Sequence, residues 1–167
     1  MKELHTPMAK PNGVQSVCIM GCGRVGAMLA EHFHSMGYAV HIIDVNSDAF
    51  RRLNTKDLRD NHTTQGDGTD PSVLERADIT HADIFIAVTN GDNRNVMAAQ
   101  IAKHQFNVAQ VICRIYDPKR HEIYRDKLGI NSICPTLIGA DAIFSTLTGS
   151  PIGASLGNGK QQGELLS

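Results

Sequence analysis

The sequence predicts a single α/β domain in which helices cover both faces of a doubly wound parallel sheet. Short apolar runs typical of buried strands alternate with longer segments whose apolar residues recur at helical spacing. A glycine-rich turn joins the first strand segment to the first helical segment, and an aspartate closes the second strand segment. The chain has 167 residues, of which 41% are apolar, and this suffices for one buried core.

Six strands are expected from these runs. The clearest is 84–88, whose sequence IFIAV contains no polar residue. The others are 16–20, 39–43, 62–65, 108–115 and 132–134. Because helical segments separate consecutive strands, the strands should be parallel, and the expected strand order is 3-2-1-4-5-6.

Capping residues mark where the helices start and end. Gly37 and Gly129 should end helices, since glycine readily adopts the left-handed conformation found there. Ser47 and Asp92 are expected to cap the starts of helices, and Pro71 should occupy a first helical position. The helices expected on this basis span 24–36, 47–53, 71–77, 92–104, 118–128 and 136–147.

Residues 15–150 are expected to form the domain. Residues 1–14 and 151–167 are poor in large apolar groups, so we expect disordered tails there. The N-terminal stretch lacks the apolar run of a secretory signal, and no segment approaches the roughly 20 apolar residues that span a bilayer. The chain is therefore expected to be cytoplasmic, with reduced cysteines, and not itself inserted into a membrane.

Composition argues against several other classes of function. The 16 Lys and Arg residues are balanced by 17 Asp and Glu residues and form no basic cluster, which disfavours nucleic-acid binding. Cys18 and Cys22 have a spacing seen in metal sites, but Cys18 lies in an apolar strand segment and Cys22 in the glycine-rich turn. No histidine pair is spaced as metal ligands on one helix face. We therefore assign no metal site and no catalytic residue.

The glycine-rich turn, GCGRVG at residues 21–26, is typical of Rossmann folds. Gly21 permits a tight turn, Gly23 lets the backbone approach a pyrophosphate, and Gly26 lets the helix pack closely. The N-terminus of the next helix offers unpaired N–H groups and a partial positive charge to phosphates. The expected phosphate site also includes the residues between these glycines: Cys22, Arg24 and Val25. Arg24 is either a phosphate partner or a solvated residue at the helix start.

An acidic residue stands where a ribose would lie. Asp44 closes the second strand, 18 residues after Gly26, and a carboxylate there accepts two hydrogen bonds from ribose hydroxyls. Its charge would repel a 2′-phosphate, so NADP is disfavoured. Val45, the next residue, is expected to contact the nucleotide too. The alternative interpretation is a purely structural glycine turn with Asp44 as a cap.

The sequence resembles the N-lobe of the regulators of potassium conductance, also called the RCK, KTN or TrkA-N domain. The matching segments occur in the family's order and cover about 120 residues. They are GCGRVG (21–26), HIIDVN (41–46), GDGT (66–69), AVTNGDNRNVMAAQIAK (87–103), RIYDPK (114–119) and LGINSICPT (128–136). The glycine turn alone is shared with dehydrogenases, whereas the later segments separate this family from them.

The resemblance implies a cytosolic regulatory domain, peripheral to the membrane, that binds NAD(H) or another adenine nucleotide such as ADP, ATP or AMP. By motif, Asp67 and Gly68 should lie beside the adenine. Thr89 and Asn90 should border the far half of the nucleotide, with Arg114 near the same crevice. The implied partners are a membrane potassium transporter or antiporter subunit and a second copy of the chain, paired through the final helix.

Two departures from the family pattern bear on these expectations. About 20 residues follow the last expected helix, so the smaller second lobe of many relatives is expected to be absent. Thr136 stands where some ATP-binding relatives have a carboxylate, which weakens the case for an ATP–cation site. The rival hypothesis is an NAD-dependent oxidoreductase. It is disfavoured because such an enzyme needs a substrate-binding region and a proton-transfer group in addition to the nucleotide fold.

Overall fold

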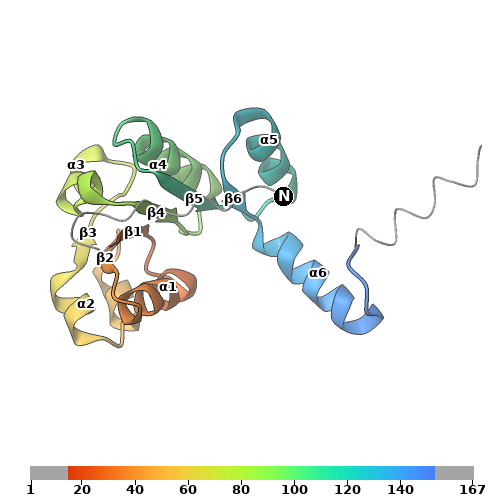
Figure 1. Ribbon diagram of the computed structural model, residues 1–167, viewed down its shortest axis with the longest axis horizontal. Helices are drawn as coiled ribbons and strands as arrows, with labels where there is room; N and C mark the ends of the chain where they lie inside the picture. The colour runs from red at the N-terminus through yellow and green to blue at the C-terminus, as the bar shows by residue number, and fades with distance from the viewer. Residues whose placement is uncertain (1–14, 153–167) are drawn as a thin grey trace, which may run out of the picture.

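The computed structural model describes residues 15–152, which form a six-stranded parallel sheet (Figure 1). In chain order the strands are β1 (Ser16–Met20), β2 (Ala39–Asp44), β3 (Thr63–Gln65), β4 (Ile84–Ala87), β5 (Gln110–Arg114) and β6 (Ser132–Ile133). The order across the sheet, β3-β2-β1-β4-β5-β6, confirms the predicted one. Of the tails expected at 1–14 and 151–167, residues 1–14 and 153–167 fall outside the described residues, whereas 151 and 152 belong to the described part.

Helices cover both faces of the sheet. They are α1 (Arg24–Ser35), α2 (Lys56–Asn61), α3 (Pro71–Arg76), α4 (Asp92–His104), α5 (Pro118–Leu128) and α6 (Pro135–Thr148), with short 3-10 helices η1 (Ser47–Arg52) and η2 (Ile79–His81). α1 and α2 lie on one face, and α3 and α4 lie on the other (Figure 1). This two-sided cover is what a parallel sheet with helical crossovers requires.

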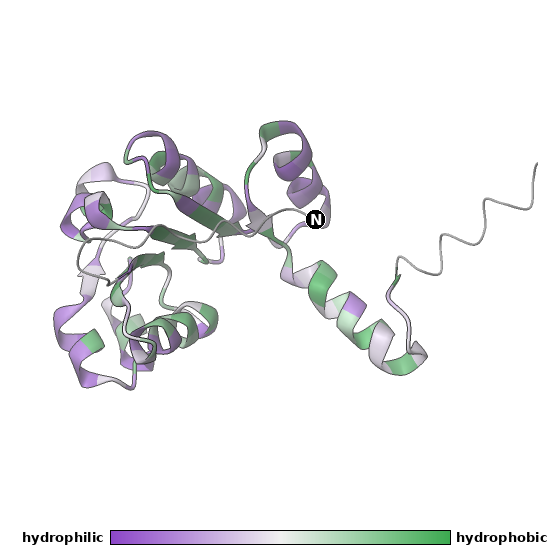
Figure 2. Ribbon diagram, viewed as in Figure 1, coloured by the Kyte–Doolittle hydropathy of each residue, from purple (hydrophilic) through white to green (hydrophobic). Residues whose placement is uncertain are grey.

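The core consists of two apolar clusters, one on each face of the sheet. Along β1, Val17 and Ile19 pack with Ala30 of α1 on one face. Cys18 and Met20 point the other way and pack into the second cluster. Successive side chains of a strand alternate between faces, so a strand buried on both faces must be apolar throughout. Figure 2 accordingly shows the central strands as strongly apolar.

Several helix ends follow the predicted capping. Gly37, just beyond α1, and Gly129, at the end of α5, have positive φ angles of 85° and 61°. These left-handed conformations suit glycine, which confirms both predicted helix ends. Pro71 opens α3, and the carboxylate of Asp70 accepts a hydrogen bond from the Ser72 N–H at 2.9 Å.

Two predicted caps are wrong. η1 is capped by the side chain of Asn46 rather than by Ser47. Asp92 does not cap α4 but already belongs to it. The Asp92 carboxylate instead accepts the N–H groups of Tyr116 and Asp117 at 2.9 and 3.2 Å. It therefore joins the start of α4 to the loop that follows β5.

α2 was not predicted, because its sequence KDLRDN has a single apolar residue and no periodicity. That residue, Leu58, is fully buried. The carboxylate of Glu31 in α1 accepts the backbone N–H groups of Asn54 and Thr55, just before α2. Tertiary contacts of this kind stabilise a helix whose local sequence is uninformative.

α6 runs from the β6 edge away from the rest of the domain (Figure 1), and none of its residues is buried. Its exposed apolar side chains are Leu137, Ile138, Ile143 and Leu147. The sequence left open whether this helix packs on its own sheet or on a partner, and in the structure it does not pack on the sheet.

Within residues 15–152, no helix combines the length and the apolar character that crossing a membrane demands.

Candidate nucleotide-binding site

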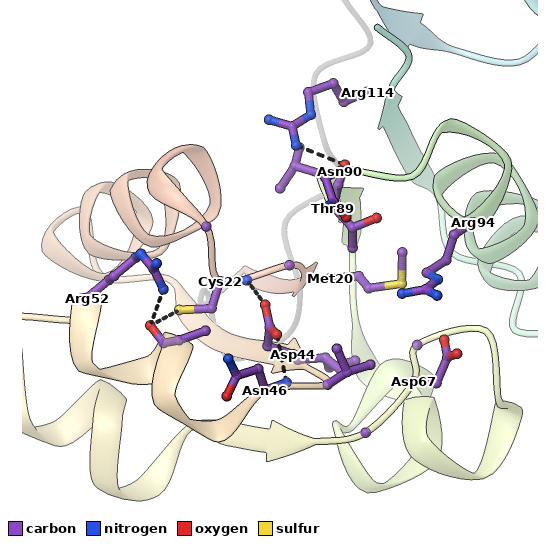
Figure 3. A pocket seen from close by; sticks show the side chains of 18 residues that line it. Met20, Cys22, Asp44, Asn46, Arg52, Asp67, Thr89, Asn90, Arg94 and Arg114 are labelled. Atoms are coloured by element: carbon purple, nitrogen blue, oxygen red, sulfur yellow. Dashed lines mark hydrogen bonds between the residues drawn. The ribbon is translucent and has the colours of Figure 1, made fainter.

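A crevice of about 340 Å³ opens at the carboxyl ends of β1, β2 and β4 (Figure 3). In doubly wound sheets, ligands bind at this edge, where the strand order reverses between β1 and β4. Of the thirteen residues that the sequence assigned to the site, ten line this crevice. They are Gly21, Cys22, Gly23, Asp44, Val45, Asp67, Gly68, Thr89, Asn90 and Arg114.

Two glycines of the turn are required by the backbone itself. Gly21 has a φ of 106°, and its N–H donates to the carbonyl of Ile43 at 2.7 Å, which ties the turn to β2. A Cβ on Gly26 would lie 1.8 Å from the Gly21 carbonyl oxygen. The absence of a side chain at Gly26 therefore allows α1 to begin directly against the turn. Gly26 is not among the residues that line the crevice.

Gly23, by contrast, is not required by the backbone. It is the residue before α1, its φ of −76° suits any residue, and a Cβ added there would meet nothing within 4 Å. No side chain caps this helix start. The first N–H groups of α1 thus have no side-chain cap, and open space lies beside the Cα of Gly23 at the crevice. Arg24 and Val25 are exposed and do not line the crevice.

Asp44 is held in place by the backbone on both sides of it. One carboxylate oxygen accepts the Cys22 N–H at 2.7 Å and the other accepts the Asn46 N–H at 2.9 Å. Each carboxylate oxygen has two acceptor positions, so both retain capacity for a further donor such as a ribose hydroxyl. The carboxylate also fixes the phosphate turn relative to β2.

The loop after β3 forms one end of the crevice. A Cβ on Gly66 would lie 2.8 Å from the side chain of Val73, so glycine is needed there for packing. The Asp67 carboxylate accepts the N–H and hydroxyl of Thr69 at 3.0 and 2.9 Å. The hydrogen bond from the Thr69 N–H is the main cause that lowers the pKa of Asp67, and Arg94 lowers it further.

The other end of the crevice is organised by Asn95, which is 0% exposed. Its amide nitrogen donates to the carbonyls of Thr89 and Arg114 at 2.8 and 2.9 Å. Its amide oxygen accepts the N–H and hydroxyl of Thr89 at 3.0 and 2.6 Å. With all its hydrogen-bonding groups used in this way, Asn95 is a structural residue that joins β4, α4 and β5.

Arg114 is the last residue of β5 and is only 8% exposed. It donates to the Thr89 carbonyl at 2.8 Å, and its guanidinium lies 4.4 Å from the centre of the Tyr116 ring. Its Nε is buried without a hydrogen-bond partner in the described part of the chain. A guanidinium whose Nε has no partner among the described residues therefore belongs to the lining of the crevice.

The four cysteines lie in the interior of the domain. All four are free and buried, and burial raises the pKa of Cys18 to about 12 and that of Cys22 to about 11. Burial therefore favours the protonated form of both thiols. Between residues 15 and 152, no cluster of three or more His, Cys, Asp or Glu side chains is arranged to hold a metal ion.

Sequence reasoning missed three polar lining residues, Asn46, Arg52 and Arg94. It also missed the apolar lining residues Met20, Ile43, Ala49 and Val88. Asn46 had a usable signal, since an Asn two residues after a strand often caps the next helix. Arg52 and Arg94 project from η1 and α4 towards the crevice (Figure 3), and no motif marks them.

Comparison with known proteins agrees with this geometry. The TrkA-N domain profile matches residues 17–136. The Trk system potassium uptake protein TrkA of Streptomyces coelicolor is 40% identical over 131 residues, which are 78% of this chain and 57% of that protein. A TrkA homolog from Pyrococcus abyssi is 35% identical over 136 residues, with 78% and 59% of the two chains covered. The chain thus spans somewhat more than half the length of these relatives.

Solved structures share the fold at low sequence identity. The TrkA-N domain of the inner membrane protein ybaL from Escherichia coli matches with a TM-score of 0.68 at 16% identity, covering 80% of this chain and 97% of that one. The AMP-bound Kef C-terminal domain of Shewanella denitrificans gives 0.65 at 21%, covering 87% and 84%. The GsuK channel bound to NAD gives 0.64 at 21%, covering 80% and 23%. From its matching profile, the chain belongs to the TrkA-N domain family.

Proposed function

We propose that this domain binds an adenine nucleotide in the crevice, NAD(H) in the first place and ADP, ATP or AMP as alternatives. One observation carries the proposal: the uncapped start of α1, the free space over Gly23 and the anchored carboxylate of Asp44 all border one continuous crevice. The relatives bound to NAD and to AMP support the same class of ligand.

In this proposal the pyrophosphate lies over the glycine turn, where Gly21, Cys22, Gly23, Arg24, Val25 and Gly26 shape the start of α1. The adenosine ribose binds Asp44, and the adenine lies between Val45 and the loop of Asp67 and Gly68. The far half of the ligand extends towards Thr89, Asn90 and Arg114.

A regulatory role fits the chemistry of the crevice better than catalysis. General acids and bases work best with pKa values near the working pH. Burial raises the pKa of the Cys22 thiol to about 11, whereas hydrogen bonds lower the pKa of Asp67. No histidine is among the described residues that line the crevice. We therefore favour a ligand sensor over an NAD-dependent oxidoreductase.

We infer that α6 transmits the ligand state of the crevice to a partner of the domain. The Thr136 hydroxyl in its first turn donates to the carbonyl of Tyr116 at 2.7 Å, and the ring of Tyr116 lies against Arg114 at the crevice. The exposed apolar side chains of α6 suit pairing with a second copy of the chain. A ligand that favours one arrangement of this pair would bias it by differential affinity.

The proposed partner is a membrane potassium transporter or antiporter subunit. In this proposal the domain binds peripherally to the cytoplasmic face of that subunit. The naming of the relatives as potassium uptake proteins supports this assignment.

Calorimetric titration of the chain with NADH, NAD⁺, ADP, ATP, AMP and NADPH tests the binding proposal. We expect one saturable site per chain, with NADPH weaker than NADH because its 2′-phosphate would face the Asp44 carboxylate. If none of the six nucleotides binds at millimolar concentration, the proposal is wrong.

A further inference from the structure

A second groove lies at the opposite edge of the sheet from the nucleotide crevice. It has a volume of about 360 Å³ and lies between the end of α4 and the end of α5. β5 joins the two cavities: Gln110 and Val111 at its start line the groove, whereas Arg114 at its end lines the crevice. The two cavities share no lining residue, so the groove is a separate site.

The floor of the groove is apolar. Val108 and Ile130 are buried in the core cluster on this face of the sheet, and Val111 packs against the same cluster. Leu128, at the end of α5, is exposed and extends the apolar surface to the rim. A cavity of this size between two helices, with an apolar base and a few polar groups at its mouth, suits a small molecule with an apolar body.

The rim of the groove carries positive charge. Lys103 and His104, in the last turn of α4, both line it. Among the described residues of the lining none is acidic, and neither of these two side chains joins any ion pair within residues 15–152. The end of a helix carries about half a negative charge, which the full charge of Lys103 exceeds. The rim therefore attracts an anion.

We propose that this groove binds an aliphatic monocarboxylate, as a second ligand site that is independent of the nucleotide crevice. The hydrocarbon tail lies on Val108, Val111 and Ile130, and the carboxylate stays at the rim beside Lys103. A ligand with an ammonium group would be repelled there. A nucleotide would place polar phosphate and ribose groups on the apolar floor, where they find no partners.

The composition of the groove sets the expected selectivity. Each methylene that the floor buries should tighten binding by up to about fourfold, so octanoate should bind roughly tenfold more tightly than hexanoate. Lys103 is exposed, and an exposed ion pair changes an affinity by about 1.5- to fivefold. Octanoate gains this attraction and octylammonium meets the matching repulsion, so octanoate should bind about fivefold more tightly than octylammonium.

The experiment is a calorimetric titration of the purified full chain with hexanoate, octanoate and octylammonium. Backbone amide chemical shifts of the labelled chain, recorded during the octanoate titration, locate the site. Octanoate should saturate a single site at low millimolar concentration. The largest shift changes should lie at Lys103, Gln110 and Ile130, at the groove.

Variants assign the binding to the groove. Lys103→Gln should remove most of the difference between octanoate and octylammonium. Lys119→Gln is the matched control, because Lys119 is an exposed residue of α5 that does not line the groove. Ala109→Phe introduces a bulky side chain at an exposed position of the lining, so it should block octanoate without disturbing the core.

Several results would overturn the proposal. The first is the lack of a saturable octanoate site, and the second is equal affinity for octanoate and octylammonium. Parental octanoate affinity in a folded Ala109→Phe variant is a third. If that variant does not fold, the parent chain decides, because shift changes confined to α6 or to the crevice place the ligand elsewhere.

A last variant separates this inference from the proposed function. Gly23→Val, which should lose nucleotide binding, should bind octanoate as the parent chain does. Failure of the chain to bind any nucleotide therefore leaves the groove proposal standing. Loss of octanoate binding in a folded Gly23→Val variant would instead place the carboxylate in the crevice and refute the proposal.

Discussion

Replacing Gly23 by valine separates nucleotide binding from folding. A Cβ at this position meets nothing within 4 Å, and the backbone φ of −76° is compatible with any residue. The cost to stability is therefore that of a poorer helix N-cap. This is at most about 1 kcal/mol, since glycine is only a moderate cap itself. The variant should remain folded.

The effect on binding should be much larger. The valine side chain would project into the space where the start of α1 offers its N–H groups to a phosphate. Hydrogen bonds to a charged group contribute about 1.5–3 kcal/mol each. Loss of two of them weakens binding by about 3–6 kcal/mol, which is more than 100-fold. Gly23→Val should thus bind NADH too weakly to measure at micromolar concentration.

The assay is calorimetric titration with NADH, run beside a thermal unfolding curve for each variant. Gly26→Ala is the contrasting variant. Its Cβ would lie 1.8 Å from the Gly21 carbonyl oxygen, so it should unfold at much lower temperature or fail to fold. Gly139→Ala in α6, where a Cβ meets nothing, should bind as the parent does. A folded Gly23→Val variant with the parent's affinity for NADH would refute the placement of the pyrophosphate.

Four further outcomes are expected. Asp44→Ala should weaken NADH binding by about 1–3 kcal/mol. It should also lower the melting temperature, because two backbone N–H groups lose their acceptor. If this variant binds NADH as tightly as the parent chain does, the ribose is recognised elsewhere. The chain should not oxidise NADH in the presence of simple aldehydes or ketones, nor reduce NAD⁺ with simple hydroxy acids. If it does, and if one mutation in the crevice abolishes the turnover, an oxidoreductase is favoured. Leu147 is 81% exposed, and Leu147→Glu should turn the dimer into a monomer, as measured by sedimentation, without changing the affinity for NADH. A parent chain that is monomeric at high micromolar concentration would contradict pairing through α6. Burial lowers the pKa of His41, so protonation favours the unfolded state. The free energy of unfolding should be highest above pH 6.5 and fall as the pH drops below it, and His41→Gln should flatten this dependence in denaturant titrations.

The sequence was most informative at positions where the local structure allows only one type of residue. The uninterrupted apolar runs identified the strands because β1 and β4 are buried on both faces. The turn role of Gly21 and the packing role of Gly26 were assigned correctly, because a positive φ at Gly21 and a close approach at Gly26 each exclude other residues. Most of the assigned site residues line one crevice because they follow strand ends that a parallel sheet brings to the same edge.

What escaped prediction depends on tertiary contacts. α2 carries one apolar residue, Leu58, and its burial against α1 and β3 leaves no periodic signal in the sequence. The structural role of Asn95 needs the positions of Thr89 and Arg114, which lie 6 and 19 residues away. The unpaired Nε of Arg114 is likewise a property of three-dimensional placement.

The most direct test of nucleotide binding in this crevice is a map of backbone amide chemical shifts of the isotopically labelled chain during titration with NADH. The largest changes should cluster at the glycine turn around Gly23, at Val45, at the loop of Asp67 and at Thr89 and Asn90. They should disappear in Gly23→Val. Changes that instead cluster in the separate groove between α4 and α5, around Lys103 and Ile130, or saturating NADH that leaves the spectrum unchanged, would contradict the account.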